Sequence, residues 1–354
     1  MIKKKLKWRF VSIVFVLLTG FGCTPTVIAK HESSMAQKSS AEEFTLKGKK
    51  YAGREYYWKK PFEAFRLFKK AAELGNPEAQ AMTGRGYYFG YGTEKDMEKA
   101  AKWYRKAAES GNSKAQASLG YLLKMGLGVK RDDESAYDWT QKAADQQNPI
   151  GMNNMGVFFQ RGIIVERDNA KAVEWYSRSS QCDYPLAKAN LGFMFQRGLG
   201  VGKNLKKAFE LYSEGCVENH PDGYYGCFYL IRGTKKRSVD EKELIRAMDT
   251  LKKACDKDEA SACRLLGDIY WEGWWKKENS TKAAESYKKS CSLGSKSACR
   301  KLGAFYNFGI GVEKDESLAR IIFEGVCDEG DIVACDALKY GIKKPRKAKE
   351  KKKK

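Results

Sequence analysis

The sequence predicts an all-α fold, an α-solenoid of stacked antiparallel helix pairs. One alanine recurs along the chain every 36 residues, with a single step of 39. Eight alanines share this register: Ala64, Ala100, Ala136, Ala172, Ala208, Ala247, Ala283 and Ala319. Bulky and small residues also recur at fixed distances from each alanine. A fixed period of this length is typical of repeat proteins, in which each unit buries its apolar face only against its neighbours.

The residues that follow each alanine predict the first helix of a unit. After Ala100, bulky side chains stand three and four places on, at Trp103 and Tyr104, and small ones seven and eight places on, at Ala107 and Ala108. This spacing is the apolar stripe of an amphipathic helix. The fourth-place residue is large in nearly every unit and the eighth-place residue is always small, a pattern that lets neighbouring helices interlock.

Glycine and proline mark a second helix in each unit. Glycines three residues beyond the small residue predict the end of the first helix, at Gly75, Gly111, Gly294 and Gly330. Prolines at one shared position predict the start of the second helix, at Pro77, Pro149, Pro185 and Pro221. A further set lies early in that helix: Gly84, Gly120, Gly156, Gly192, Gly267 and Gly303. Since glycine weakens a helix, we expect a partner helix that passes too close for a Cβ atom.

The segment AAKWYRKAAESGNSKAQASLGYLLKMGLGV, residues 100–129, resembles a Sel1-like repeat, a helical repeat related to TPR. The resemblance covers residues 61–342 as about seven full repeats and a truncated eighth. It implies a right-handed superhelix that presents a concave face to protein partners. The handedness and the kind of partner come from the resemblance alone.

The N-terminus predicts export. Five basic residues precede an apolar run at 10–21, and Val27-Ile28-Ala29 has the small residues of a cleavage site, so residues 1–29 are interpreted as a secretory signal peptide. The apolar run is shorter than a transmembrane helix needs, and no such helix is expected in the mature protein. Lipid attachment at Cys23 is the alternative. Residues 30–60 are expected to be a flexible polar lead-in followed by an aromatic cap on the first repeat.

Ten cysteines are present, and eight of them form pairs in the last four repeats. The pairs are Cys216 with Cys227, Cys255 with Cys263, Cys291 with Cys299, and Cys327 with Cys335. Each pair joins the end of one helix to the start of the next, where a tight hairpin brings them together, so we expect four disulfides in an oxidising compartment. Metal ligation is the competing interpretation, but the spacing does not suit zinc and no histidine takes part. Cys182 is left over, and we expect a buried small side chain rather than an intermolecular disulfide.

The cysteine-bearing units, about residues 206–342, resemble the Helicobacter cysteine-rich family of secreted Sel1-like proteins, and they include the spacing Cys291-SLGSKSA-Cys299. The resemblance implies secretion, repeats held by disulfides, and a link with β-lactams as binders or weak hydrolases. The first four repeats depart from that family because they lack the paired cysteines.

The sequence offers little material for catalysis, and no catalytic, cofactor or metal residue is predicted. Only two histidines exist, His31 and His220, which argues against Ser-His-Asp, Cys-His and zinc β-lactamase sites. Ser286-Tyr287-Lys288-Lys289 reads S-x-x-K, but no S-D-N or K-T-G accompanies it. We interpret this match as a coincidence and expect Ser286 to point into a helix interface.

Two features are candidates for partner binding. Trp274 and Trp275 replace the usual Gly-x-Gly return to the next unit, and tryptophan is enriched in interface hot spots. Packing against a neighbouring helix or loop is the alternative for both. The tail Lys343–Lys354, KKPRKAKEKKKK, could contact an anionic envelope or host surface, or could simply be a solvated tail. Nucleic-acid binding is not expected, because no basic stripe with interleaved aromatic residues follows the repeats.

These observations together favour an exported scaffold, periplasmic or secreted, that mediates protein–protein interaction in the bacterial envelope or with a host. The alternative is a β-lactam-binding protein or β-lactamase-type hydrolase, as the cysteine-rich resemblance implies.

Overall fold

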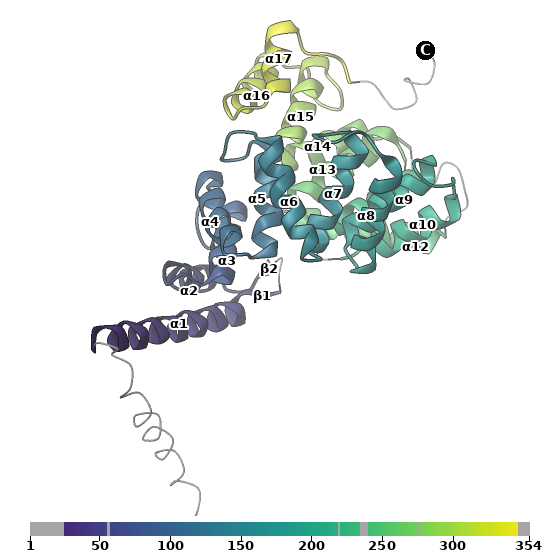
Figure 1. The fold of residues 1–354 in the computed structure, drawn as a ribbon. Helices are drawn as coiled ribbons and strands as arrows, with labels where there is room; N and C mark the ends of the chain where they lie inside the picture. The colour runs from purple at the N-terminus through teal and green to yellow at the C-terminus, as the bar shows by residue number, and fades with distance from the viewer. Residues whose placement is uncertain (1–24, 55–56, 219, 234–239, 275–276, 346–354) are drawn as a thin grey trace, which may run out of the picture. The chain divides into compact units, whose positions relative to one another are not determined.

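The structure, a computed structural model, describes residues 25–54, 57–218, 220–233, 240–274 and 277–345. The chain divides into two compact units, residues 1–53 with 58–110 and residues 54–57 with 111–354. Helices dominate both units, and the described segments confirm the all-α fold (Figure 1).

The described part of the first unit holds four helices. Its elements are α1 (Pro25–Ala52), α2 (Pro61–Glu73), α3 (Pro77–Phe89) and α4 (Met97–Glu109). Two short strands, β1 (Gly53–Arg54) and β2 (Tyr57–Trp58), pair with each other after α1. The buried ring of Trp58 packs on Phe68 and Tyr91, with ring centroids 5.3 and 5.4 Å away. An aromatic residue of the expected cap thus contacts the first repeat.

The N-terminal helix corrects one expectation. Residues 30–50 were expected to be a flexible lead-in, but they belong to α1, which packs along α2. Small residues four, three and four places apart make this contact possible: Ala41, Thr45, Gly48 and Ala52. The ring of Phe68 lies so close to Gly48 that a Cβ atom there would be 2.7 Å away. This stripe could not be recognised from apolar periodicity, because it consists of small residues instead of large apolar ones.

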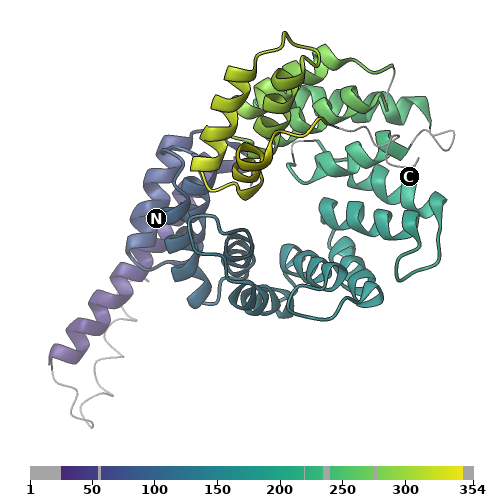
Figure 2. The ribbon, with the colours of Figure 1, turned by 90° about the horizontal axis from the view of Figure 1, so that it is seen from above.

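The second unit continues the helix pairs. Its elements are α5 (Ser113–Met125), α6 (Asp133–Asp145), α7 (Pro149–Arg161), α8 (Asn169–Gln181), α9 (Pro185–Arg197), α10 (Leu205–Gly215), α11 (Gly223–Gly233), α12 (Glu241–Asp256), α13 (Ala260–Glu272), α14 (Ser280–Ser292), α15 (Lys296–Phe308), α16 (Glu316–Asp328) and α17 (Ile332–Tyr340). Each helix contacts the next along the chain, and they stand in order along a curve (Figure 2). The odd-numbered helices also touch one another, α5 with α7, α9 with α11 and α11 with α13. We therefore call the odd-numbered helices of this unit the inner helices.

The predicted helix boundaries are confirmed with one exception. The glycines that end the first helices have positive φ angles, for example 89° at Gly75 and 84° at Gly294. Pro77, Pro149 and Pro185 each occupy the first position of a helix. Pro221 does not, because α11 begins two residues later, at Gly223. The three-residue insertion in this turn separates the proline from the helix start.

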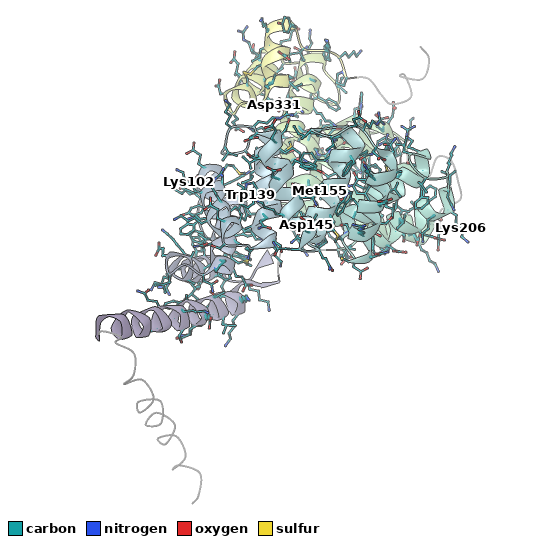
Figure 3. All side chains as sticks on the ribbon, viewed as in Figure 1. Lys102, Trp139, Asp145, Met155, Lys206 and Asp331 are labelled. Carbon is teal, nitrogen blue, oxygen red and sulfur yellow. A yellow bond between two sulfur atoms is a disulfide. The ribbon has the colours of Figure 1, made fainter. Side chains whose placement is uncertain are left out.

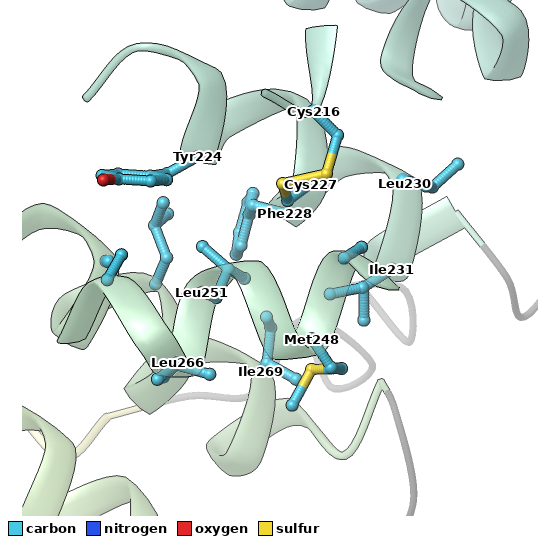
Figure 4. Packing of buried hydrophobic residues seen from close by; sticks show 14 of the residues in the cluster. Cys216, Tyr224, Cys227, Phe228, Leu230, Ile231, Met248, Leu251, Leu266 and Ile269 are labelled. Atoms are coloured by element: carbon cyan, nitrogen blue, oxygen red, sulfur yellow. A yellow bond between two sulfur atoms is a disulfide. The ribbon is translucent and has the colours of Figure 1, made fainter. Parts of the chain in front are cut away.

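An extended apolar cluster of the second unit spans α10 to α13. Tyr224, Leu230 and Leu251 are almost completely buried in it (Figure 4). The Cys216–Cys227 disulfide belongs to the same cluster, and both of its cysteines are buried. Asp331 lies at the start of α17 (Figure 3). Arg300 of α15 donates to both of its carboxylate oxygens, at 2.7 and 2.8 Å, and so fixes the start of this helix.

Candidate binding pocket on the inner helices

A partly buried carboxylate joins three helices of the second unit. Asp268 of α13 accepts a hydrogen bond of 2.7 Å from the Tyr287 hydroxyl of α14 and one of 3.0 Å from Arg264 of its own helix. The ammonium group of Lys301, on α15, contacts the same carboxylate. The Asp268 side chain is only 13 % exposed. Two cations and a hydroxyl therefore compensate one poorly solvated charge, as burial of a carboxylate requires.

The sequence explains why Asp268 has this role. In two earlier units the equivalent tyrosine hydroxyl donates to a glutamine four residues after the helix glycine, Tyr176 to Gln160 at 2.7 Å and Tyr212 to Gln196 at 3.2 Å. In α13 that position holds Trp271, which offers no acceptor. Asp268, almost one turn earlier, supplies it.

Burial and the Asp268 charge determine the protonation state of Tyr287. Burial, followed by the negative charge of Asp268 and the hydrogen bond to it, raises the pKa of Tyr287 well above its usual value near 10. The phenol therefore remains a donor at every physiological pH.

Next to this network is a cavity of about 320 Å³, which we call the inner pocket. Its lining is Phe228 and Arg232 from α11, Asp268, Trp271, Glu272 and Trp274 from α13 and the loop after it, Tyr287 from α14, Lys301 and Phe305 from α15, and Pro345. Aromatic rings form its walls and both signs of charge are present, which is typical of sites that combine apolar burial with a few polar contacts.

Trp274, a candidate from the sequence, forms part of one wall. Its ring packs edge-on against Phe228, with centroids 5.3 Å apart, and the guanidinium carbon of Arg232 lies 5.1 Å from its centroid. Trp274 is half-buried, so it packs on a neighbouring helix and also lines the pocket. Trp275 lies outside the described residues. Trp271 was not predicted as a site residue. The sequence could have indicated it, because Trp271 stands where two earlier repeats have Gln160 and Gln196.

The four expected disulfides are present and hold the helices that line the pocket. They join Cys216 to Cys227, Cys255 to Cys263, Cys291 to Cys299 and Cys327 to Cys335, with Cα atoms 4.4 to 4.8 Å apart. Three of them fasten the early turns of α11, α13 and α15, the inner helices of the pocket. Covalent fixation of these helices favours a preformed site, which loses less entropy on binding.

The expected environment of Cys182 is wrong. This cysteine is free and exposed. It follows the last residue of α8 as the C-cap, just before Asp183, whose φ angle is positive at 56°. The side chain therefore lies in the turn between two helices, outside the packed interface.

The remaining candidates do not form a catalytic arrangement. The Ser286 hydroxyl is half-buried on α14 and donates to the carbonyl of Lys282 at 2.7 Å, while Lys289 pairs with Asp258 at 3.1 Å. His220 accepts from the backbone N–H of Asp222 at 3.2 Å in the turn before α11. Within the described part of the chain, no three His, Cys, Asp or Glu side chains are close enough to hold a metal ion. None of the described helices has the length and apolar character to cross a bilayer. Cys23 lies outside the described residues.

Comparison with known families identifies the repeat. The Sel1 repeat model matches seven segments, which are residues 59–76, 77–112, 113–148, 149–184, 185–216, 260–295 and 296–331. These segments cover more than half of the chain. The chain belongs to the Sel1 repeat family. The Sel1 model leaves out residues 217–259, the part that contains the insertion and the first disulfide-bonded helix, α11.

Several solved Sel1-type structures are similar to this chain. A protective antigen of uropathogenic Escherichia coli with an SLR fold is 26% identical, covers 88% of this chain and 74% of its own, and has a TM-score of 0.44. A Sel1 repeat protein from Oxalobacter formigenes is 28% identical, with 88% and 91% covered and a TM-score of 0.43. Cysteine-rich protein B of Helicobacter pylori is 33% identical over 38% of this chain and 96% of its own, with a TM-score of 0.29. No curated protein matches the sequence.

Proposed function

We propose that this Sel1 repeat chain is an exported scaffold that binds a protein partner at the inner pocket, in the bacterial envelope or on a host. The observation that carries the proposal is the half-buried indole of Trp274 in the wall of a cavity on the inner helices. Tryptophan and arginine are the residues that most often dominate binding energy, and both line this pocket.

Export is supported by the disulfides. Four disulfides among ten cysteines are typical of a protein that folds outside a reducing cytosol. The N-terminal pattern of basic residues, apolar run and small residues supports the same interpretation. Anchoring through Cys23 remains the lipoprotein alternative, and contact of the Lys343–Lys354 tail with an anionic surface remains a prediction. Residues 346–354 of that tail lie outside the described residues.

Photo-crosslinking tests the binding proposal. A benzophenone amino acid replaces Ser297 of α15, which lines a cavity that shares Lys301 and Pro345 with the inner pocket. In a second chain it replaces the exposed Lys288 on α14. We expect one specific adduct from position 297 and none from position 288. Trp274→Ala should abolish that adduct, and Trp175→Ala, which removes an indole from α8, should leave it unchanged. Equal adducts from both positions, or no effect of Trp274→Ala, would contradict the proposal.

Thiol counting tests export. The full chain is expressed in a bacterium, unfolded without reductant and treated with maleimide-polyethylene glycol. Cleavage after Ala29 and four disulfides leave one reactive thiol, Cys182, whereas a chain expressed without residues 1–29 in the cytosol should show nine. Ten free thiols in the full chain, with Cys23 retained and no disulfide formed, would contradict export. Hydrolysis of a chromogenic cephalosporin by the oxidised protein would instead support the β-lactamase-type alternative.

A further inference from the structure

The chain continues beyond its last helix as a short extended segment beside the inner helices. After α17 ends at Tyr340, residues Gly341–Pro345 form neither helix nor strand. The backbone of Lys344 is restricted to extended conformations because a proline follows it. In a polyproline-type conformation, side chains three places apart lie on the same side. The exposures agree, because Ile342 and Pro345 are half-buried while Lys343 and Lys344 are exposed.

The two half-buried residues contact different parts of the second unit. Ile342 packs against the apolar cluster that contains Phe323 and Val326 of α16. A cavity of about 560 Å³ opens beside it, lined by Ser297 and Lys301 of α15 and by residues 341–343 and 345. Pro345 also lines the inner pocket, together with Trp274. Lys301 and Pro345 line both cavities, so the two cavities adjoin, and together their linings make a surface that runs from α17 to α11.

We propose that this surface is a groove for an extended peptide in which an apolar residue precedes a proline by three positions. Ile342 and Pro345 hold this groove in the free chain, and the partner must displace them. The inference rests on the proposed function, because it names the partner of the same pocket. Aromatic side chains are a general means of binding proline, since the extended peptide is already close to its bound conformation.

The charges in the groove distinguish apolar peptide binding from the electrostatic binding of a polybasic tail to a polyanion. Lys343 and Lys344 are exposed, and the inner pocket contains two cations, Arg232 and Lys301, as well as two carboxylates. The charges of the peptide therefore add little, and binding comes from burial of the two apolar side chains. Such binding persists at high salt, whereas binding of a polybasic tail to a polyanion weakens.

The test uses a fluorescein-labelled peptide with the sequence of residues 340–345, YGIKKP, and the full chain. Residues 341–345 are tethered to α17 and therefore act at a millimolar effective concentration. In the wild-type chain they compete with the added peptide. We expect the peptide to bind the Ile342→Gly/Pro345→Gly chain about tenfold more tightly than the wild-type chain, by fluorescence anisotropy. The same peptide with alanine in place of proline should bind at least about tenfold more weakly.

A second set of chains identifies the pocket. In the Ile342→Gly/Pro345→Gly background, Trp274→Ala should reduce peptide affinity about tenfold, whereas Trp175→Ala should not change it. Thermal unfolding checks that every chain is folded. Equal affinities for the wild-type and the released chain, equal binding of the proline and alanine peptides, or loss of binding at about 0.5 M NaCl would each overturn the proposal. If the peptide fails but the adduct from position 297 still depends on Trp274, the scaffold function stands and only this inference falls.

Discussion

Gly267 of α13 lies directly against the ring of Tyr287 of α14, so close that a Cβ atom at position 267 would be 2.4 Å from the ring carbon Cε1. The same relationship joins Gly156 to Tyr176, with a corresponding distance of 2.5 Å. It confirms the expectation that each helix glycine marks the close approach of a partner helix. The large residue that faces the glycine is the fourth-place residue of the next repeat.

Gly267→Ala should therefore destabilise the chain, although alanine favours helices. Overpacking of a well-filled interface typically costs about 1–3 kcal/mol, more than the gain in helix propensity. Gly325→Ala on α16 is the matched control, because nothing lies within 4 Å of its Cβ position. That change should stabilise the chain by about 0.5–1 kcal/mol. Chemical denaturation of both variants measures the difference, and a shift of the same sign would contradict the packing argument.

Removal of the Cys255–Cys263 disulfide by alanine at both positions should lower the free energy of unfolding. The bridge joins residues only eight apart, so it closes a short loop in the unfolded chain. The lost loop entropy stabilises the folded state by about 2 kcal/mol. Cys182→Ala, which removes a free and exposed thiol, should change stability by less than about 0.5 kcal/mol. Urea titrations under oxidising conditions compare the two, and equal midpoints would show that the bridge does not restrain the chain.

The Asp268 network predicts an unequal response to two substitutions. Asp268→Ala removes the carboxylate that Arg264, Lys301 and the Tyr287 hydroxyl share, and we expect the free energy of unfolding to fall by about 3 kcal/mol. Asp268→Asn retains an acceptor oxygen and should cost less. Glu324→Ala, which breaks an exposed ion pair with Arg320, should cost at most about 1 kcal/mol. A smaller loss for Asp268→Ala than for Glu324→Ala would contradict the described network.

Lys124 on α5 should make stability depend on pH. Its ammonium group lies 5.6 Å from the Phe158 ring centroid, and burial, followed by the charge of Arg161, lowers the pKa of Lys124 from 10.5 to about 8. Between those two values the unfolded chain binds a proton that the folded chain does not. The contribution of Lys124 to the free energy of unfolding therefore rises as the pH increases from about 8 to 10.5.

Chemical denaturation of Lys124→Met from pH 7 to about 10.5 tests the direction in which the Lys124 contribution to stability changes with pH. The variant should gain most over the wild type at pH 7, and the gain should shrink as the pH passes through the window. Lys288→Met on α14 controls for loss of an exposed surface charge. A gain for Lys124→Met that stays constant from pH 7 to pH 10.5 would contradict the lowered pKa.

Features of the fold that recur in each repeat could be predicted from the sequence, whereas features that occur only once could not. The 36-residue spacing repeats the same contact many times, so the alanine, tyrosine and glycine positions reinforce one another. The cysteine pairs could be predicted because the hairpin geometry is the same in each repeat. Helix α1 occurs once and its stripe is made of small residues, so no second copy revealed it.

The pocket depends on departures from the repeat, which explains why only part of it was predicted. Trp274 drew attention because it replaces a glycine-containing return. Asp268 and Trp271 each differ from their counterparts in other repeats, but their effect appears only when α13, α14 and α15 are packed together. Pro345 is far from Trp274 in sequence, and no local pattern places it beside the pocket.

The uneven distribution of disulfides makes one end of the second unit more resistant to local unfolding than the other. Helix pairs from α10 onward are joined by disulfides, whereas the described pairs from α5 to α9 are held by non-covalent contacts. Stability in a repeat array is approximately the sum of local terms, so opening starts where those terms are smallest. A protease acting on the native chain will therefore nick the non-covalently held pairs first and leave a resistant fragment that retains the pocket.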